Sequence, residues 1–418
     1  MGNIEILSPA GDFEKLRVAI AYGADAVYLS GKSYGLRAGS GNFSRDEMAE
    51  AIVYAHERDV RCYVTMNILA HEKDMEAVDE EIIFYHSIAA DALIVSDPGI
   101  FRRIKQLFPD FEIHISTQAS VTNADSCLFW YEQGARRIVL ARELTLAEIK
   151  AIRDKIPPDM SLECFVHGAM CMSYSGRCLL SNYFTGRGAN QGACAQPCRW
   201  NYLVREEKRP GEPLPVEEDA RGTYIFNSKD ICMIEHIPEL VSAGIDSFKI
   251  EGRIKGTFYV ATTTKVYREA VDAYLDNPSN YSPNPVWKLI LERTVHRVFG
   301  TGFFFDTPSQ NAQIFPDDTY LRMAFVAGMV VGYDEAAKCA IVSQRNKIYE
   351  GDELFVLTPS GYVDSIIAEK MTDEAGEKIQ STPKAQMLYY LPIAKPLPVF
   401  TFLGKMGDKD GAAPVLKN

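Results

Sequence analysis

Nine cysteines occur in this chain, and five of them lie within residues 171–232. The five are Cys171, Cys178, Cys194, Cys198 and Cys232. Clustered thiols in a reducing cytoplasm are typical of soft metals or iron–sulfur centres. Only Cys194 and Cys198 have the close spacing of the paired hooks in structural zinc sites, because Cys171 and Cys178 are seven residues apart. This irregular, all-thiolate pattern favours an iron–sulfur centre, with zinc and inert packing cysteines as alternatives.

A basic and aromatic stretch overlaps the cysteine cluster. Residues 171–210 contain six basic and two acidic residues, in a chain with a net charge of −12. The basic residues are Arg177, Arg187, Arg199, Arg205, Lys208 and Arg209, and the aromatic residues between them are Tyr174, Tyr183, Phe184, Trp200 and Tyr202. The overall acidity argues against a protein that coats nucleic acid nonspecifically. The segment is consistent with a local nucleic-acid-binding face, and equally with an ordinary solvated loop around a metal site.

Hydrolase motifs are weak in this chain. It contains no His-Glu-x2-His helix of the zinc proteases. A Gly-x-Ser-x-Gly pattern occurs at residues 31–35, but a glycine-rich loop follows it, whereas the elbow of a serine hydrolase needs a helix there. Lys32 and Arg37 in this loop are candidates for holding an anionic substrate, and the alternative is a loop with solvated charges.

The elements that must position these residues read as an α/β fold. Eight strand-like runs alternate with amphipathic helical stretches, at residues 4–7, 26–29, 61–65, 92–95, 112–116, 137–140, 162–166 and 247–250. This alternation predicts a TIM-like parallel α/β barrel, with an open doubly wound sheet as the alternative. Gly23, Gly134 and Gly244 each end a helical pattern just before a run, as C-caps do. Ser44 with Glu47 and Thr145 with Glu148 predict capping boxes at two helix starts.

The barrel is expected to occupy residues 1–276. A cysteine-rich insertion over residues 168–222 interrupts it, and an extra strand is expected at 223–226. Residues 277–319, which begin with a proline-rich stretch, are expected to form a linker and a connecting helix. Residues 320–418 predict a small C-terminal β-barrel with strands at 323–331, 340–343, 354–357 and 399–402.

In such a barrel the working residues lie where strands end and the following loops begin. The polar residues expected there are Ser8, Asn67, Asp97, Gln118, Arg142, Glu163, His167, Lys249, Glu251 and Arg253. Glu163 is a candidate proton acceptor, and His167 a candidate acid, base or hydrogen-bond donor, because both closely precede the first clustered cysteine. The alternative for all of them is barrel-rim structure. Cys164 points away from Glu163 and is expected to pack as a small apolar residue.

Length and composition fit a protein of two or three domains. The chain has 418 residues, of which 47% are hydrophobic. Its start lacks the basic and apolar regions of a signal peptide, and no run of about 18 apolar residues could span a bilayer. An odd cysteine count argues against a disulfide framework. We therefore expect a soluble, cytoplasmic protein without a membrane partner.

Residues 163–181 carry an extended motif. Its defined positions are Glu163, Phe165, Gly168, Ala169, Met170, Cys171, Gly176, Cys178, Leu180 and Ser181. At every one of these positions the chain matches the signature of the collagenase-like peptidase U-32 family, which it resembles. Residues 192–199, 227–232, 248–253 and 344–354 are similar to that family as well. The resemblance therefore covers nearly the whole chain.

The resemblance implies several activities. Some members of the family are described as proteases, and others are iron–sulfur proteins that hydroxylate tRNA wobble uridine with prephenate, ribosomal RNA or ubiquinone without molecular oxygen. It implies a four-iron four-sulfur cluster at Cys171, Cys178 and Cys194, with either Cys198 or Cys232 as the fourth ligand. Arg142, Lys249 and Arg253 are then candidates for recognising a dicarboxylate such as prephenate.

Among these activities, the full-length architecture favours hydroxylation of tRNA wobble uridine to 5-hydroxyuridine. The expected partners are tRNA, a small dicarboxylate co-substrate and the machinery that assembles iron–sulfur clusters. A collagenase-like peptidase and a non-catalytic RNA-binding or assembly protein are the alternatives.

Overall fold

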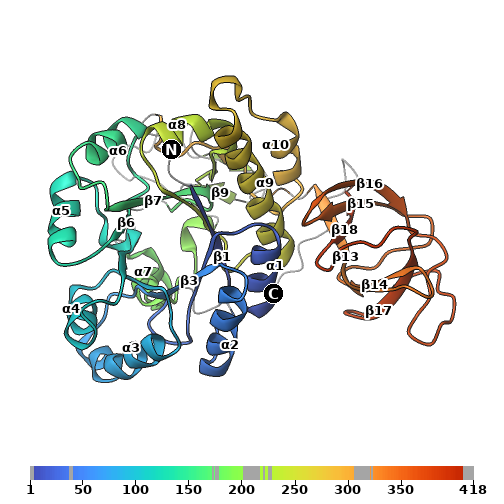
Figure 1. The fold of residues 1–418 in the computed structure, drawn as a ribbon, viewed down its shortest axis with the longest axis horizontal. Coiled ribbons are helices and arrows are strands. Elements are labelled where there is room, and N and C mark those ends of the chain that lie inside the picture. The colour runs from blue at the N-terminus through green and yellow to red at the C-terminus, as the bar shows by residue number, and fades with distance from the viewer. Residues whose placement is uncertain are drawn as a thin grey trace.

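The computed structural model of the chain describes residues 4–36, 41–171, 174, 178–200, 217–219, 222–224, 228–305, 321 and 323–407. Its larger part is a barrel of eight parallel strands (Figure 1). In order around the barrel they are β1 (Glu5–Pro9), β2 (Ala26–Leu29), β3 (Arg61–Met66), β4 (Ala92–Val95), β5 (Ile113–Ile115), β6 (Arg137–Val139), β7 (Ser161–Gly168) and β11 (Ser247–Ile250). Because β11 pairs in parallel with both β7 and β1, the sheet closes on itself. This closure confirms the predicted TIM-like α/β barrel and excludes the open sheet.

Helices cover the outside of the barrel. They are α1 (Phe13–Ala21), α2 (Arg45–His56), α3 (Val78–Ser87), α4 (Pro98–Leu107), α5 (Ala124–Glu132), α6 (Leu146–Arg153), α8 (Ile237–Ser242) and α9 (Thr257–Asp276). Both predicted capping boxes are confirmed, at Ser44 of α2 and Thr145 of α6. Gly23, Gly134 and Gly244 have φ values of 94°, 101° and 82°, a left-handed conformation that favours glycine. Within the described ranges, no helix combines the length and the hydropathy that crossing a membrane requires.

Side chains alternate between the two faces of each barrel strand. Outward residues such as Leu29 pack with the helices in the main hydrophobic core. Inward residues, among them Tyr28 and Ile94, form a smaller cluster that fills the barrel. Cys164 belongs to the outer core and is buried, which confirms its predicted packing role.

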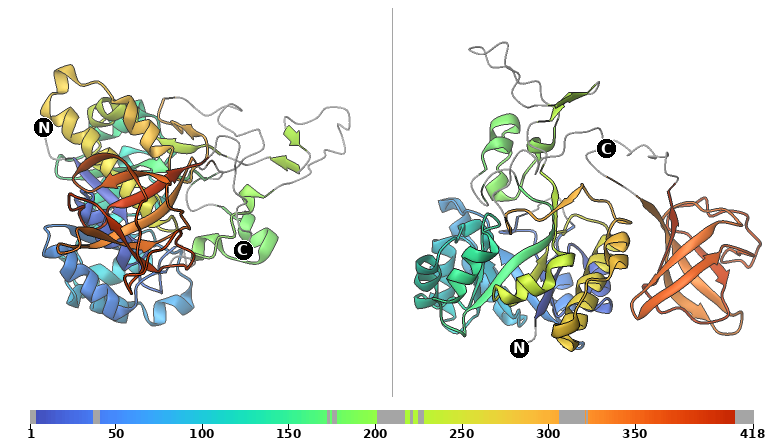
Figure 2. Two further views of the ribbon diagram at one scale, coloured as in Figure 1. Left: turned by 90° about the vertical axis from the view of Figure 1, so that its right-hand side faces the viewer. Right: turned by 90° about the horizontal axis from the view of Figure 1, so that it is seen from above.

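The cysteine-rich insertion follows β7. Its described elements are α7 (Leu180–Thr185), the short 3-10 turns η3 (Ala189–Gln191) and η4 (Pro197–Arg199), and the hairpin of β8 (Glu217–Asp219) and β9 (Gly222–Tyr224). They stand over one end of the barrel (Figure 2). Of the extra strand predicted at 223–226, the structure describes residues 223 and 224, which lie in β9, whereas 225–227 lie outside the described residues. The chain then returns as β10 (Asp230–Cys232), which pairs antiparallel with the end of β7.

The segment after α9 packs back onto the barrel. After the turn η6 (Pro278–Asn280), helix α10 (Pro285–Leu291) buries Trp287, whose indole N–H donates to Glu269 of α9 at 3.1 Å. Strand β12 (Phe299–Gly300) then pairs in parallel with β10. The described part of this segment is therefore an outer layer of the barrel.

The C-terminal domain is one antiparallel sheet of six strands that curls into a half-barrel. Its strands are β13 (Ala324–Asp334), β14 (Cys339–Gln344), β15 (Glu353–Thr358), β16 (Gly361–Ile367), β17 (Leu388–Pro392) and β18 (Phe402–Met406). Three of the four predicted strands are confirmed. The fourth, predicted at 399–402, is wrong by three residues because the strand begins at Phe402, and β16 and β17 were not predicted.

The two domains meet at α1 and α9 (Figure 1). Tyr22 and Ala261 of the barrel helices pack against Met329, Leu357 and Phe402 of the half-barrel. The Tyr22 hydroxyl lies 2.9 Å from the Leu357 carbonyl oxygen. This apolar contact fixes the half-barrel to the outer helices, on the side of the barrel that bears α1 and α9.

Candidate active site

A cavity of about 140 Å3 opens at the C-terminal ends of the barrel strands. Inward side chains of six strands line it, namely Tyr28, Thr65, Ile94, Val139, Phe165 and Lys249. The remaining lining residues come from the loops that follow the strands and from the insertion. Active sites of TIM barrels occupy this position, because the loops at this end are free to vary while the strands stay rigid.

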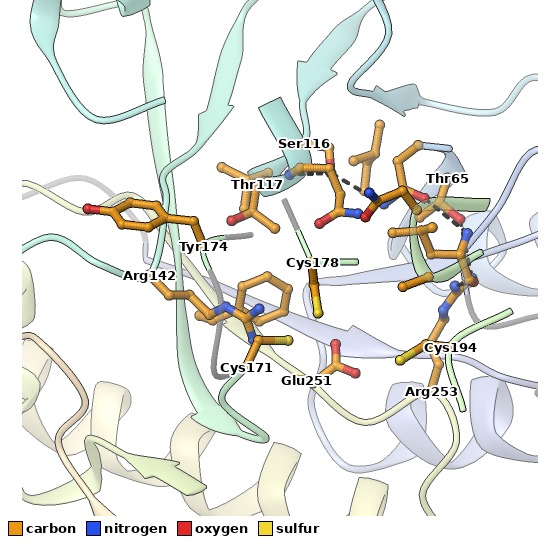
Figure 3. A pocket seen from close by; sticks show the side chains of 18 of the residues that line it. Thr65, Ser116, Thr117, Arg142, Cys171, Tyr174, Cys178, Cys194, Glu251 and Arg253 are labelled. Atoms are coloured by element: carbon orange, nitrogen blue, oxygen red, sulfur yellow. Dashed lines mark hydrogen bonds between the residues drawn. The ribbon is translucent and has the colours of Figure 1, made fainter. Parts of the chain in front are cut away.

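Four of the five clustered cysteines line this cavity: Cys171, Cys178, Cys194 and Cys198. Cys171 follows β7 directly, Cys178 precedes α7, and the other two lie between η3 and the end of η4. Figure 3 shows the thiols of Cys171, Cys178 and Cys194 turned toward the same part of the cavity. The structure therefore brings together thiols that the sequence separates by up to 27 positions, from Cys171 to Cys198.

Ser181, the last residue of the signature motif, holds the described part of the insertion together. It is almost fully buried at the start of α7. Its hydroxyl oxygen accepts the N–H of Ala195 at 2.9 Å, and its carbonyl accepts the hydroxyl of Thr185 at 2.6 Å. The N–H of Leu69, after β3, donates to the Asn190 carbonyl at 3.0 Å and ties the insertion to the barrel. These bonds fix α7 and the Cys194 region relative to the cavity.

Cys232 and His167 lie together away from the cavity lining. They face each other across the antiparallel pair of β10 and β7, and both lie beside Tyr267 of α9. Burial raises the pKa of the Cys232 thiol to about 12 and lowers the pKa of His167 to about 3. His167 is therefore neutral at physiological pH in this structure. Its predicted role as an acid, base or donor stays a prediction.

The described thiols line one cavity but do not form a ready-made site for a single metal ion. In the described part of the chain, no three His, Cys, Asp or Glu side chains lie close enough to hold a metal ion. A zinc ion bound to four thiolates at about 2.3 Å holds their sulfur atoms roughly 3.8 Å apart. The described lining offers four thiols, the type of ligand that both structural zinc sites and iron–sulfur clusters take.

Arg142 lies beside the first of these thiols. Its guanidinium donates to the Ala169 carbonyl at 2.9 Å and lies 5.4 Å from the ring centroid of Phe165. Burial alone would lower the pKa of Arg142, but the neighbouring Cys171 thiol and Glu251 carboxylate outweigh it and raise that pKa. The side chain is a fixed cation at the cavity wall.

Arg253 and Lys249 add two more cations to the lining. Arg253 is buried and donates to the Thr65 hydroxyl at 3.2 Å and to the Leu36 carbonyl. Lys249 lies at the floor, where its ammonium is 4.6 Å from the ring centroid of Tyr28. With Glu251 as the lining carboxylate, the described lining has an excess of positive charge that suits an anionic ligand.

Glu163 lies below the cavity and does not line it. Its carboxylate accepts the Lys249 ammonium at 2.6 Å and the Arg137 guanidinium at 3.1 Å. Burial alone would raise the pKa of Glu163, but these two cations outweigh it and lower that pKa, so the carboxylate is ionised. The predicted role of Glu163 as a proton acceptor stays a prediction. The direct role that the structure shows for Glu163 is to hold the Lys249 ammonium in position.

The Glu163 pair is part of a larger buried ion network that the sequence did not reveal. Glu5 of β1 accepts Arg137 and Arg61, and it also accepts the Tyr63 hydroxyl at 2.7 Å. Burial would raise the pKa of Glu5, but Arg137 outweighs it and lowers that pKa to about 2. The network forms a charged layer in the lower half of the barrel.

The other predicted residues are distributed around the rim. Gln118 and Asn67 line the cavity, whereas Lys32 lines a separate depression of about 180 Å3 beside α2. Arg37 lies outside the described residues. Asp97 caps α4 through the N–H groups of residues 99 and 100, and the Ser8 hydroxyl is hydrogen-bonded to Thr264 on the outer side of the barrel at 2.6 Å.

Sequence reasoning missed the aromatic and hydroxyl residues of the lining. They are Tyr28, Thr65, Ser116, Thr117 and Phe165, of which Thr65, Ser116 and Thr117 are labelled in Figure 3. A usable signal was present, since Tyr28, Thr65 and Phe165 each stand at the last or second-last position of a predicted strand, on its inward face.

Similar proteins span most of this chain. It is 39% identical over 378 residues to tRNA hydroxylation protein P1 of Bacillus subtilis, an alignment that covers 90% of this chain and 89% of the relative. It is 36% identical over 435 residues to tRNA hydroxylation protein P of Escherichia coli, with 94% of each chain covered. It is also 40% identical over 372 residues to a Methanocaldococcus jannaschii protein described as an uncharacterized protease, covering 87% of this chain and 89% of the relative.

Family models match both domains. The model of peptidase family U32 matches residues 11–314, and the model of the U32 C-terminal domain matches residues 322–403. The first match contains every barrel strand from β2 onward and all the cavity-lining cysteines. The chain therefore belongs to peptidase family U32.

Proposed function

We propose that this protein is an RNA-modifying enzyme that hydroxylates the wobble uridine of tRNA to 5-hydroxyuridine without molecular oxygen. The observation that carries the proposal is the cavity itself, which four thiols and three cations line at the C-terminal end of the barrel strands. Relatives that align over about nine tenths of this chain are named for tRNA hydroxylation. A redox centre beside an anion-binding wall suits this chemistry and is not needed for peptide hydrolysis.

The cofactor we propose is a four-iron four-sulfur cluster held by Cys171, Cys178, Cys194 and Cys198. These four thiols line one cavity, whereas Cys232 lies behind β7 with its thiol at Tyr267. A bound cluster would supply one-electron transfer. The chain's own contribution is to hold the thiols at fixed points through β7 and Ser181, and to cover the site from water.

The co-substrate we propose is a small dicarboxylate such as prephenate. Arg142 and Arg253 border the cavity, and Lys249 forms its charged floor. Each cation has a fixed position, because Arg142 is bound to the Ala169 carbonyl, Arg253 to Thr65 and Lys249 to the carboxylate below it. A planar guanidinium binds a carboxylate through two parallel hydrogen bonds, so two arginines and a lysine can orient two carboxylates.

The RNA substrate must present an unpaired nucleotide to this cavity. A cavity with a volume of about 140 Å3 can hold a single base and is too small for a double helix. Asn67 and Gln118 line the wall and offer amide donors and acceptors for the edge of a base. A uridine in an exposed loop meets this requirement without the cost of unpairing.

Mass spectrometry of tRNA nucleosides from a strain that lacks this protein tests the function. We expect 5-hydroxyuridine and its derivatives to disappear, to return with the wild-type gene and to stay absent with Cys171→Ser. Protein purified without oxygen should be brown and should contain iron and sulfide. Unchanged nucleosides in the deletion strain, or a colourless protein fully loaded with zinc, would refute the proposal.

The described residues around Ser33 do not form the nucleophile elbow that a serine peptidase of this kind needs. Strand β2 ends at Leu29 and α2 begins only at Arg45, so Ser33 does not sit on a strand-to-helix elbow. If the purified protein cleaved gelatin, and still did so after Cys171→Ala and Cys178→Ala, peptide hydrolysis would replace hydroxylation as the function.

A further inference from the structure

Four aromatic side chains of the insertion are exposed to solvent. The exposed fractions are 54% for Tyr174, 81% for Tyr183, 45% for Phe184 and 43% for Trp200. We call these four residues the aromatic platform. A folded protein gains nothing from exposing large aromatic rings next to one another, and such patches usually mark contact surfaces.

The platform lies outside the hydrophobic cores of the described fold. None of its residues belongs to the hydrophobic clusters of the described chain or to the side chains packed against them. Three of the rings lie next to one another. Tyr183 and Phe184 contact edge to face, with centroids 5.2 Å apart and an interplanar angle of 85°, and Phe184 and Trp200 are tilted by 56° at 6.4 Å. Neither pair is stacked face to face.

The platform borders the cavity and has a fixed position relative to it. Tyr174 itself lines the cavity, as do Leu180 at the start of α7 and Cys198 in η4. The hydrogen bonds to Ser181 tie α7, which carries Tyr183 and Phe184, to the chain that leads to Trp200. Figure 2 shows α7 standing over the end of the barrel at which the cavity opens. A ligand that enters the cavity from the insertion side therefore passes these rings.

We propose that the aromatic platform stacks unpaired bases of a single-stranded RNA loop that flank the base in the cavity. This inference rests on the proposed RNA substrate and adds the surface that positions it. Every base offers a flat face, so exposed rings bind single strands with little sequence preference. A double helix buries those faces, and the platform distinguishes a loop from a duplex.

The charge of the chain favours this mode of binding. A net charge of −12 repels an RNA backbone, so much of the affinity must come from contacts other than phosphate contacts. Residues 171–210 contain six basic and two acidic residues, so this segment does not repel the phosphate backbone of an RNA as the rest of the chain does. If all six basic residues of this segment contacted phosphates, the slope of log K against log salt would be about −4 for a single strand. We therefore expect a slope no steeper than this, together with substantial binding that survives at high salt.

Fluorescence anisotropy tests the platform with the anaerobically purified full-length protein. The probes are a synthetic RNA hairpin with an unpaired loop and a blunt RNA duplex of the same length. We expect the hairpin to bind more tightly than the duplex. Tyr183→Ala and Trp200→Ala should each weaken hairpin binding by roughly 5- to 150-fold, the range measured for the loss of one stacked base. Tyr183→Phe keeps the ring and should bind like the wild type.

Phe129→Ala is the matched control, because Phe129 is 54% exposed on α5, outside the insertion. It should leave hairpin binding unchanged. Equal binding of hairpin and duplex, unchanged hairpin affinity in the alanine variants, or equal losses in the Phe129 variant would overturn the platform. Thermal melts of each variant show whether a loss of binding comes from unfolding, and Tyr183→Phe then separates the ring from the fold.

The outcome also separates the platform from the proposed function. Ring-dependent hairpin binding by a protein whose deletion leaves tRNA nucleosides unchanged keeps the platform and refutes hydroxylation. Loss of 5-hydroxyuridine in the deletion strain, combined with unchanged binding and KM in Tyr183→Ala and Trp200→Ala, keeps hydroxylation and refutes the platform.

Discussion

Glu163→Gln tests the charged floor of the cavity. The change removes the carboxylate that binds the Lys249 ammonium at 2.6 Å and the Arg137 guanidinium at 3.1 Å, and it preserves the shape of the side chain. Arg137 keeps Glu5 as a partner, but Lys249 loses its carboxylate. All of these groups are buried, so water cannot replace the lost charge without entering the barrel.

The expected loss of stability is about 2–4 kcal/mol. Removing one partner from a buried ion pair typically costs about 3–5 kcal/mol. The cost should be lower here because glutamine keeps an oxygen that accepts from Lys249, and the Tyr28 ring stays 4.6 Å from the ammonium. Lys249→Met should reduce the penalty in the double variant, so the two changes together should cost less than their sum by about 1–3 kcal/mol.

Urea unfolding followed by tryptophan fluorescence measures this loss. Trp130, Trp200 and Trp287 all precede residue 320, so fluorescence reports on the barrel and not on the half-barrel. The lowered pKa of Glu163 fixes the sign of the pH dependence, because its stabilisation is present above the unfolded pKa of about 4.3 and is lost as pH falls through the folded pKa. The deficit of Glu163→Gln should thus be constant above about pH 6 and shrink below about pH 4. A deficit under about 1 kcal/mol at pH 7, or strict additivity with Lys249→Met, would refute the reasoning.

Three further changes probe the support of the cavity. Gly168 has a φ of 105°, and a Cβ atom there would lie 2.5 Å from a carbonyl oxygen, so Gly168→Ala should lower the free energy of unfolding by more than about 2 kcal/mol in the same urea assay. Asp230→Ala removes the carboxylate that binds buried Arg297 at 2.8 Å and should cost about 3–5 kcal/mol by urea unfolding. Cys198→Ser should lower the iron content and visible absorbance of anaerobic protein, whereas Cys232→Ser should retain both.

Matched controls accompany these changes. Gly186 has a φ of 69° with no atom within 4 Å of the added Cβ, so Gly186→Ala should cost only about 1 kcal/mol. Lys288→Met breaks an exposed pair with Glu235 and should cost less than about 1 kcal/mol. Equal costs for Gly168→Ala and Gly186→Ala would contradict the crowding at Gly168. Equal costs for Asp230→Ala and Lys288→Met would contradict the importance of burial for the Asp230–Arg297 pair. If Cys232→Ser lost iron and Cys198→Ser retained it, Cys232 would replace Cys198 as the proposed fourth ligand.

The barrel was predictable because its signals are local. Strands buried on both faces appear as short apolar runs, and helix ends carry caps such as Ser44. The C-terminal strand β18 was misplaced because Gly404 and Lys405 interrupt its apolar pattern. Gly404 is required by a distant residue, since a ring atom of Phe355 lies 2.1 Å from where its Cβ would be. A propensity argument cannot detect this requirement, which exists only in the folded sheet.

The site was predictable in its residue types but not in its grouping. The clustering of the cysteines identified the five thiols, and the family resemblance left Cys198 and Cys232 as candidates for the fourth ligand. In the structure the pairing of β10 with β7 sets Cys232 opposite His167, and Cys198 lines the cavity whereas Cys232 does not. The partners of Glu163 depend likewise on pairing across the barrel, which sets Ser247 beside Glu163 and places Lys249 two residues farther toward the cavity.

The carbonyl groups of residues 167–170 explain how the barrel controls the position of Cys171. The His167 carbonyl accepts the N–H of Glu251 at 2.9 Å, and the Ala169 carbonyl accepts Arg142 at 2.9 Å. The Met170 carbonyl accepts Arg297 at 3.5 Å. The donors come from the loops after β11 and β6 and from the segment before β12, so three separate parts of the barrel hold this one stretch.

The first cysteine is therefore held by the barrel, whereas Cys178 and Cys194 are held by the insertion around Ser181. Binding of the proposed cluster would join these two supports, because its proposed ligands come from both. Folding of the insertion and loading of the cofactor should then be coupled, as they are in other proteins whose metal sites exist only in the folded state. Asp230 binds Arg297, which in turn donates to the Met170 carbonyl. We therefore expect Asp230→Ala to lower the iron content as well as the stability, although Asp230 itself lies outside the cavity lining.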